Sequence, residues 1–265
     1  MRNYNPEGSA LRKDQLEMLK ALEAFARICR ENDIQWWLCS GTLLGAARHK
    51  GFIPWDDDMD ISMFDEDYKK LEKILVRMDD EDYFYQCIKS DPEHVNVFGK
   101  FRKKNDPVFA ADQRSKYFKY QGVGLDVFSL EKSNRFAAHM AKFLYQNLIH
   151  PTQYIKNRFW RHFAIKSVQL LNFGLLIPLC RLIGHINHKG QYRYKLGSGF
   201  YQCGFSAEDI LPLRTMEFEG IEFPVPGNTD AYLTKIYGDW RKLPSEEQIR
   251  KTMHYPLYIK EIFGE

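Results

Sequence analysis

Four aspartates crowd into five positions of the chain: Asp56, Asp57, Asp58 and Asp60. Alternate side chains of a strand share a face, so Asp58 and Asp60 are expected to project together while Met59 points into a core. Two adjacent carboxylates repel each other, and a divalent cation removes that conflict. Oxygen ligands suit Mg²⁺ or Mn²⁺, which also bind substrate phosphates. The pattern predicts a Mg²⁺ (or Mn²⁺) site with Asp58 and Asp60 as ligands and Asp56 and Asp57 in support.

Two other interpretations of the acidic run are a solvated loop and an EF-hand. Apolar residues flank the run at 52–55 and at positions 59, 61 and 63, and exposed acidic segments lack such flanks. An EF-hand needs Gly at its sixth position and Glu at its twelfth, where Ile61 and Asp67 stand. A buried metal site is therefore favoured.

A third carboxylate is expected, because two aspartates rarely complete an octahedral shell. Asp126 is the best candidate, since it is a lone acid inside the apolar run GLDVFSL at 124–130 and a buried acid requires a partner. The alternative is an aspartate that caps a turn or pairs with an arginine. Asp106 and Asp112 lie in loop-like sequence and are weaker candidates.

Ser40, Gly41 and Thr42 separate a predicted strand from a predicted helix. The first N–H groups of a helix have no partners within it and attract anions. Arg48 and Lys50 follow, between this turn and the acids. The segment predicts a phosphate held between amides, a cation and a metal. An ordinary connection between strand and helix is the alternative.

Hydrophobic spacing predicts the elements that must position these residues. Helices are predicted over 9–31, 65–78, 229–240 and 245–253, with another directly after Thr42. Strands are predicted over 34–39, 59–63, 82–88, 96–103 and 124–130, with a hairpin over 214–226 that turns at Glu219-Gly220. The acids therefore fall at strand starts or within strands.

Charge is distributed unevenly along the chain. The 76 residues at 132–207 contain 11 Lys and Arg but no Asp or Glu. The uncharged run at 167–180 is too short to cross a bilayer core of about 30 Å as a helix. We expect a basic helical segment that lies on an anionic membrane surface; the alternative is a helical subdomain whose basic face covers the acidic body. Nucleic acid is not expected, because no recognised motif accompanies the charge.

The five cysteines are scattered, without a CxxC pair, and the N-terminal residues lack an apolar signal core. A reducing compartment is the simplest interpretation. Together with the basic segment, this predicts a cytoplasmic protein, peripheral on the inner face of the plasma membrane.

The stretch GTLLGAAR at 41–48, followed by IPWDDDMD at 53–60, resembles the signature of the LicD family of phosphotransferases, relatives of the fukutin-related proteins. LDVF at 125–128 and YGDW at 237–240 with His254 behind also fit. The resemblance spans roughly 34–130 and 214–256 and leaves 133–200 unmatched. It implies an α/β (α+β) fold, with a nucleotidyltransferase-like mixed sheet flanked by helices and a basic helical insertion.

The resulting organisation is a catalytic core at 1–131, the basic segment at 132–207, and a hairpin with helices at 208–265 that completes the catalytic domain. The resemblance implies metal-dependent transfer of a phospho-alcohol, phosphocholine first, from a CDP-activated donor to a hydroxyl of a cell-surface glycan or its lipid-linked precursor. It also implies that Asp58, Asp60 and Asp126 are the metal acids and that Ser40, Gly41 and Thr42 form the family's glycine-containing turn.

Further roles follow as hypotheses. Asp126 would also accept or orient the acceptor's hydroxyl proton, and Arg48 would neutralise a phosphate oxygen. Lys100 and Arg102, two apart on a predicted strand, would reach the site from one face, with an exposed basic edge as the alternative. His254 would contact phosphate or act as a general acid. Aromatic faces attract trimethylammonium groups, and the candidates are Trp36, Trp37, Trp55, Tyr117, Phe118 and Tyr120.

Two other classes of function stay open. One is a nucleotidyltransferase that moves NMP from CTP or ATP to a sugar or small molecule and releases pyrophosphate. The other is a non-catalytic, membrane-associated binding module in which the basic segment does the work. The intact pair of aspartates at 58 and 60 argues against the second, because a module has no reason to keep buried acids.

Overall fold

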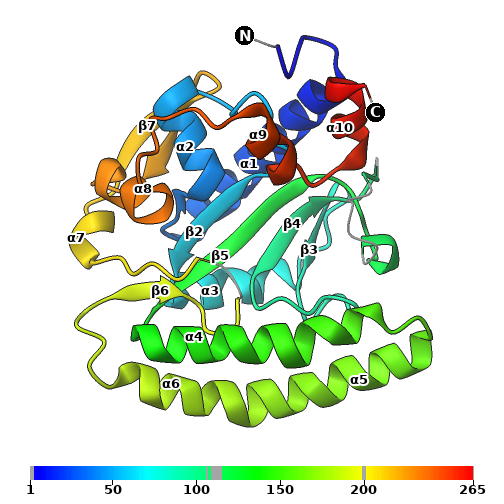
Figure 1. Ribbon diagram of the computed structural model, residues 1–265, viewed down its shortest axis with the longest axis vertical. Helices are drawn as coiled ribbons and strands as arrows, with labels where there is room; N and C mark the ends of the chain where they lie inside the picture. Colours follow the sequence, from blue (N-terminus) through cyan, green and yellow to red (C-terminus); the bar gives the residue numbers. More distant parts are fainter. Residues whose placement is uncertain (1–2, 106, 109–114, 199–200, 265) are drawn as a thin grey trace.

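The computed structural model describes residues 3–105, 107–108, 115–198 and 201–264. Asp106 and Asp112 lie outside the described residues. A central sheet runs through the molecule, with helices on both sides of it, and a layer of helices formed by α4, α5 and α6 closes one end (bottom of Figure 1). The predicted fold, a mixed sheet flanked by helices, is confirmed.

The main sheet has the strand order β1-β2-β5-β4-β3. The short strand β6 pairs with β5, beyond the stretch of β5 that pairs with β4. Only β2 and β5 run parallel; the other described pairs are antiparallel. A second sheet consists of β7 and β8. The strands are β1 (Trp37–Leu38), β2 (Asp60–Phe64), β3 (Tyr83–Gln86), β4 (Gly99–Lys103), β5 (Gly124–Lys132), β6 (Tyr192–Tyr194), β7 (Arg214–Phe218) and β8 (Ile221–Val225).

The register of the sheet brings residues from three strands into one row. Asp60 at the start of β2 is opposite Asp126 in β5, and Lys100 in β4 is opposite Asp126 on the other side. These residues are 26 to 66 positions apart in the sequence, and the sheet alone makes them neighbours. The two strands that carry Asp60 and Asp126, β2 and β5, are therefore neighbours, as the predicted site requires.

The α-helices are α1 (Ala10–Glu31), α2 (Ser40–His49), α3 (Asp65–Leu75), α4 (Arg135–Leu144), α5 (Arg158–Leu171), α6 (Ile177–His185), α7 (Ala207–Ile210), α8 (Thr229–Tyr237), α9 (Glu246–Thr252) and α10 (Pro256–Phe263). Ser9 caps α1 by accepting from the Arg12 N–H, and Asn32 ends it, as predicted. The hairpin does turn at Glu219 and Gly220, which both adopt positive φ (52° and 80°).

Some predicted bounds were wrong. The strand predicted over 34–39 shortens to β1, because only two of its residues pair with β2. The helix predicted over 229–240 ends at Tyr237, because Gly238 leaves the helical region with φ 69°. Strand β6 and helices α7 and α10 were not predicted; β6 has only three residues, too few for a periodic signal.

The largest hydrophobic core draws on both ends of the chain. It contains Phe25 of α1, Val127 of β5, Phe218 of β7 and Leu233 of α8. The helices of the basic segment have two small clusters of their own, one around Ala137, Ala141, Ile177 and Cys180 and one around Tyr145 and Ile165. The basic segment therefore packs on the body through two small hydrophobic clusters that are separate from the main core.

Candidate active site

The acidic run lies in irregular backbone, because strand β2 begins only at Asp60. The alternation expected for a strand therefore does not apply to residues 56–59. The Asp56 and Asp58 carboxyl groups lie close together, and after burial the charge of Asp58 is the next cause of the raised pKa of Asp56. Whether Asp56 supports the site or itself contacts the metal stays a prediction.

The N-terminus of α2 lies against the same acids. An added methyl group on Gly41 would come within 2.7 Å of Asp56 Oδ2, so the missing side chain of Gly41 leaves room for that carboxylate. Thr42 Oγ1 accepts the backbone N–H of Asp60 at 2.8 Å. Ser40, with φ 48°, has its hydroxyl 3.4 Å from that of Tyr194. Residues 40–42 were predicted as a turn before the helix, but they form the first turn of α2 itself. They border the acids directly, where a helix dipole favours negative charge.

Burial and mutual repulsion destabilise the ionised form of these carboxylates. Burial raises the pKa of Asp60 well above its usual value, and the charges of Asp58 and Asp126 raise it further. Burial also raises the pKa of Asp56, with Asp58 again the next cause. A cation placed among these oxygens would remove the repulsion. The donor set is all carboxylate oxygen, which fits Mg²⁺ or Mn²⁺.

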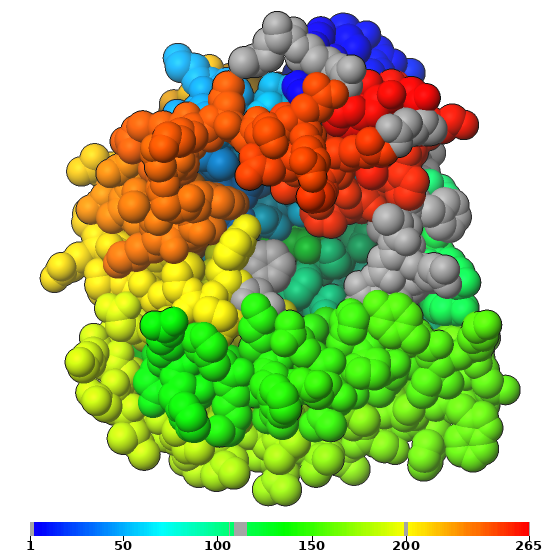
Figure 2. Space-filling model, viewed as in Figure 1, coloured from blue at the N-terminus to red at the C-terminus, as the bar shows by residue number. Residues whose placement is uncertain are grey.

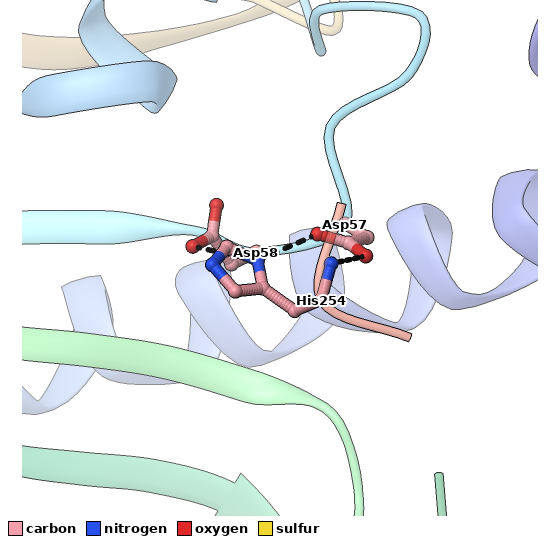
Figure 3. Close-up of side chains that lie close together, drawn as sticks. All are labelled: Asp57, Asp58 and His254. Carbon is pink, nitrogen blue, oxygen red and sulfur yellow. Dashed lines mark hydrogen bonds and ion pairs between the residues drawn. The ribbon is translucent and has the colours of Figure 1, made fainter. Parts of the chain in front are cut away.

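A second group of ligand atoms comes from opposite ends of the chain (Figure 3). One atom each of Asp57, Asp58 and His254 lie within 4.8 Å of one another. Asp57 accepts the backbone N–H groups of His254 and Tyr255, at 2.6 and 3.0 Å, and the His254 imidazole Nδ1 at 2.9 Å. Asp57 therefore fastens the C-terminal segment to the acidic run.

At neutral pH the His254 imidazole is in its positively charged form, with a proton on both ring nitrogens. Its hydrogen bond to Asp57 raises its pKa to about 9, against the opposing effect of burial, and the charge of Asp58 adds to the rise. Its Nδ1 is 3.6 Å from Asp58 Oδ2. The imidazolium thus lies beside the acids as a positive charge, in a position consistent with the predicted phosphate contact.

Asp126 has a partner other than a metal. Lys100 Nζ donates to both of its oxygens, at 2.6 Å for Oδ2. Asp58, Asp60 and Asp126 do not form a ligand group as compact as the one with His254, because the compact group among the described residues contains only Asp58 of the three. Asp126 nevertheless interacts electrostatically with both other acids. Its role as a metal ligand stays a prediction.

The two predicted arginines hydrogen-bond to neutral groups in this structure, although Arg48 lies near enough to Asp56 for their charges to interact. Arg48, at the end of α2, donates to the Trp240 carbonyl at 3.1 Å. Arg102 is buried and donates to Gln86 Oε1 at 2.7 Å and to the Gly122 carbonyl at 2.8 Å. Spacing placed Arg102 on the same face as Lys100, but the neighbouring loop takes up its guanidinium. Phosphate contacts by either arginine stay predictions.

The family model described as "LicD/FKTN/FKRP, nucleotidyltransferase domain" matches residues 33–170. That stretch is more than half of the chain and contains α2, all four clustered aspartates and Asp126. The chain belongs to this family. The match continues past residue 130 into α4 and α5, where the motifs quoted above had ended.

Two curated relatives show how far the similarity of this LicD-family chain extends. It is 28% identical to the lipopolysaccharide cholinephosphotransferase LicD of Haemophilus influenzae over 96% of this chain and 97% of that protein. It is 40% identical to the human ribitol 5-phosphate transferase FKRP, but over 60 residues, or 21% of this chain and 12% of that protein.

The aromatic candidates for a cation cage have other packing partners in this LicD-family chain. Trp36 and Trp37 are buried in the main core, and Trp55 packs edge-on against Tyr4. Tyr117 lies under the Arg161 guanidinium, and Phe118 and Tyr120 pack near Arg102 and Phe84. The structure assigns these aromatics to packing.

Sequence reasoning missed two tyrosines near the acids. The hydroxyls of Tyr201 and Tyr237 are 3.4 Å apart, and both interact electrostatically with Asp60. Tyr237 belongs to the YGDW motif, which was the available signal. Tyr201 carries no sequence signal, because the fold alone brings it from beyond β6 to α8.

Substituting Gly41 with alanine tests the room left for Asp56. The new methyl group would displace the end of a side chain, so we expect the variant to fold but to bind Mn²⁺ roughly 10- to 100-fold more weakly. Titration calorimetry with Mn²⁺ measures this. The matched control is Gly45→Ala, whose methyl would meet the Gly51 carbonyl at 2.5 Å and should cost about 1–3 kcal/mol of stability. Unchanged Mn²⁺ affinity in Gly41→Ala would remove Asp56 from the site.

Proposed function

We propose that this LicD-family protein transfers a phospho-alcohol, with phosphocholine as the first choice, from a CDP-activated donor to a hydroxyl of a cell-surface glycan or its lipid-linked precursor. The observation that carries the proposal is similarity along almost the whole chain to a lipopolysaccharide cholinephosphotransferase. The cluster of buried carboxylates beside the α2 N-terminus supports it, because phosphoryl transfer depends mainly on positioning and charge neutralisation.

The residues that would hold Mg²⁺ or Mn²⁺ are Asp58 and Asp60, with Asp126 completing the set and Asp56 beside them. A divalent ion bound there would supply positive charge against the donor diphosphate and its leaving group. His254 and Lys100 would bring further positive charge from the C-terminal segment and from β4. Asp57 holds His254 in place through its three hydrogen bonds.

In the proposed reaction, the acceptor's hydroxyl oxygen forms a bond to the phosphorus that carries the alcohol. The bond from that phosphorus to the bridging oxygen breaks, and CMP leaves with the electron pair. Asp126, adjacent to Asp60 across the β2–β5 pair, would take the hydroxyl proton. Lys100 donates to both oxygens of Asp126 and so fixes the orientation of the carboxylate.

A ligand screen tests the choice of donor. We expect CDP-choline with Mg²⁺ to raise the unfolding midpoint more than CDP-ethanolamine, CDP-ribitol, CDP-glycerol or CTP, because a ligand that binds the folded state stabilises it by mass action. Omitting Mg²⁺ should remove most of the shift. A larger shift with CDP-ribitol would change the donor, and release of pyrophosphate from CTP in place of CMP from the CDP-alcohols would contradict the proposed reaction.

A further inference from the structure

The outer surface of the helical layer carries most of the exposed large apolar side chains of the molecule. Of the 15 such residues in the described part of the chain, 12 fall between 136 and 186. They include Phe159 and Leu170, which are 69% and 77% exposed. We call this set the apolar face: Phe136, Phe143, Tyr154, Phe159, Trp160, Phe163, Leu170, Leu171, Leu175, Leu179, Leu182 and Ile186. Soluble proteins rarely expose so much apolar surface in one place without a binding partner.

Most residues of the apolar face lie on one long helix. Residues 158–185 form α5, a π turn (Asn172–Leu176) and α6 in sequence. The buried positions are Arg161, Ile165 and Gln169 before the turn, and Ile177, Cys180 and Gly184 after it. The extra residue of a π turn shifts the helical phase, so the buried positions stay on one side and the apolar face stays on the other. Figures 1 and 2 show this helical layer at the outer end of the molecule.

Basic residues border the apolar face. Lys156 and Arg158 at the start of the long helix, Lys166 within it and Lys189 beyond it are all exposed. The body uses other cations of the segment: Arg161 pairs with Glu93, Arg181 with Glu131, and Lys195 with Asp65. The subdomain alternative therefore accounts for part of the positive charge, while Lys156, Arg158, Lys166 and Lys189 stay exposed. Because 132–207 contains no acid, a second copy of this face would bring like charges together.

One helix, 158–185, is long and apolar enough to cross a membrane by length and composition. At 1.5 Å per residue it would measure about 42 Å. However, Arg161 is buried in an ion pair with Glu93, and Gly184 packs against Ala137 and Ser133. A spanning helix would have to give up these contacts and leave Glu93 without its main partner. The packing thus favours a helix that lies in the plane of a membrane.

We propose that the apolar face docks on an anionic lipid bilayer, with the helix 158–185 lying in the interface and the exposed lysines contacting lipid headgroups. Apolar area and positive charge on one helix face are the two requirements of interfacial binding. This inference concerns where the protein binds and is independent of the transfer reaction. It places the chain at a membrane without a transmembrane segment.

Co-sedimentation of the full chain with vesicles tests the proposal. We expect binding to phosphatidylcholine vesicles that contain about a third phosphatidylglycerol, and little binding to phosphatidylcholine alone. Lys156→Gln combined with Lys166→Gln should weaken binding roughly 30-fold. Leu170→Ser combined with Leu182→Ser should weaken it at least tenfold. Matched controls are Lys73→Gln and Leu257→Ser, which change exposed residues outside the segment and should bind as the unaltered protein does.

Depth of insertion separates the in-plane helix from a spanning one. A Leu171→Trp variant in a Trp160→Phe background places a reporter at the middle of the helix. We expect lipids brominated near the headgroup to quench it more strongly than lipids brominated near the chain ends. Stronger quenching by the deep label would overturn the in-plane arrangement.

Three further results would overturn the docking proposal itself: no binding to anionic vesicles at low salt, equal loss of binding in the control variants, or a stable dimer abolished by Leu170→Ser with Leu182→Ser. Unfolding curves of each variant show whether it is folded. CMP release by the unaltered protein in solution tests the proposed function separately.

Discussion

Asp60→Asn is expected to lower the rate of phospho-alcohol transfer by roughly a thousandfold or more while leaving the protein folded. Asparagine keeps the shape of the side chain but removes one of the charges that the site would present to a metal. The backbone N–H of residue 60 still donates to Thr42. Release of CMP from CDP-choline in the presence of a glycan acceptor measures the effect.

The stability of the same variant should move in the opposite direction. Burial and the charges of Asp58 and Asp126 hold the pKa of Asp60 well above its usual value, so the ionised cluster works against folding when no cation is bound. Asp60→Asn removes that cost, and without divalent ions its unfolding midpoint should equal or exceed that of the unaltered protein. Mg²⁺ should stabilise the variant less. Asp33→Asn, at an exposed position, is the matched control; full turnover in Asp60→Asn would discard the site.

Arg161→Met is expected to lower the free energy of unfolding by about 3–5 kcal/mol, because it leaves the buried Glu93 carboxylate without its main partner and with only His162 beside it. Arg161 is 1% exposed and donates to Glu93 at 2.8 and 2.9 Å. Its guanidinium also lies 3.8 Å from the centre of the Tyr117 ring. Urea unfolding measures the loss. The control is Arg158→Met, which removes an exposed arginine from the same helix and should change stability by less than about 0.5 kcal/mol.

The pH dependence of this pair has a definite sign. Burial raises the pKa of Glu93, but the hydrogen bonds and charges of Arg161 and His162 together outweigh burial and hold that pKa below its usual value. A carboxylate with a lowered pKa stabilises the fold above its unfolded pKa, about 4.3, and this contribution is lost as the pH falls through the folded pKa. The difference between unaltered protein and Arg161→Met should therefore be largest at neutral pH and smaller at pH 4. An unchanged difference would assign the loss to packing rather than charge.

The sequence by itself determined the acidic cluster, its preferred chemistry and most of the elements around it. Asp58 and Asp60 stand out because four acids lie among apolar residues, and Asp126 because it is alone in an apolar strand. The hairpin turn at Glu219-Gly220 was predictable for a local reason, since only a few residue types adopt positive φ at low cost. The family signature lies in one continuous run, which is why it could be recognised without a structure.

Only the tertiary structure decided which side chains meet. Asp57 lies beside His254 although 197 positions separate them, and Lys100 reaches Asp126 because β4 and β5 pair in that register. Asp56 borders Gly41 of α2 and lies close enough to Asp58 for their charges to interact, although residues 56–59 are not part of a strand. Residue spacing describes one local stretch at a time. Contacts between distant segments depend on strand pairing and on the packing of helices and loops around the core. Both are properties of the whole fold.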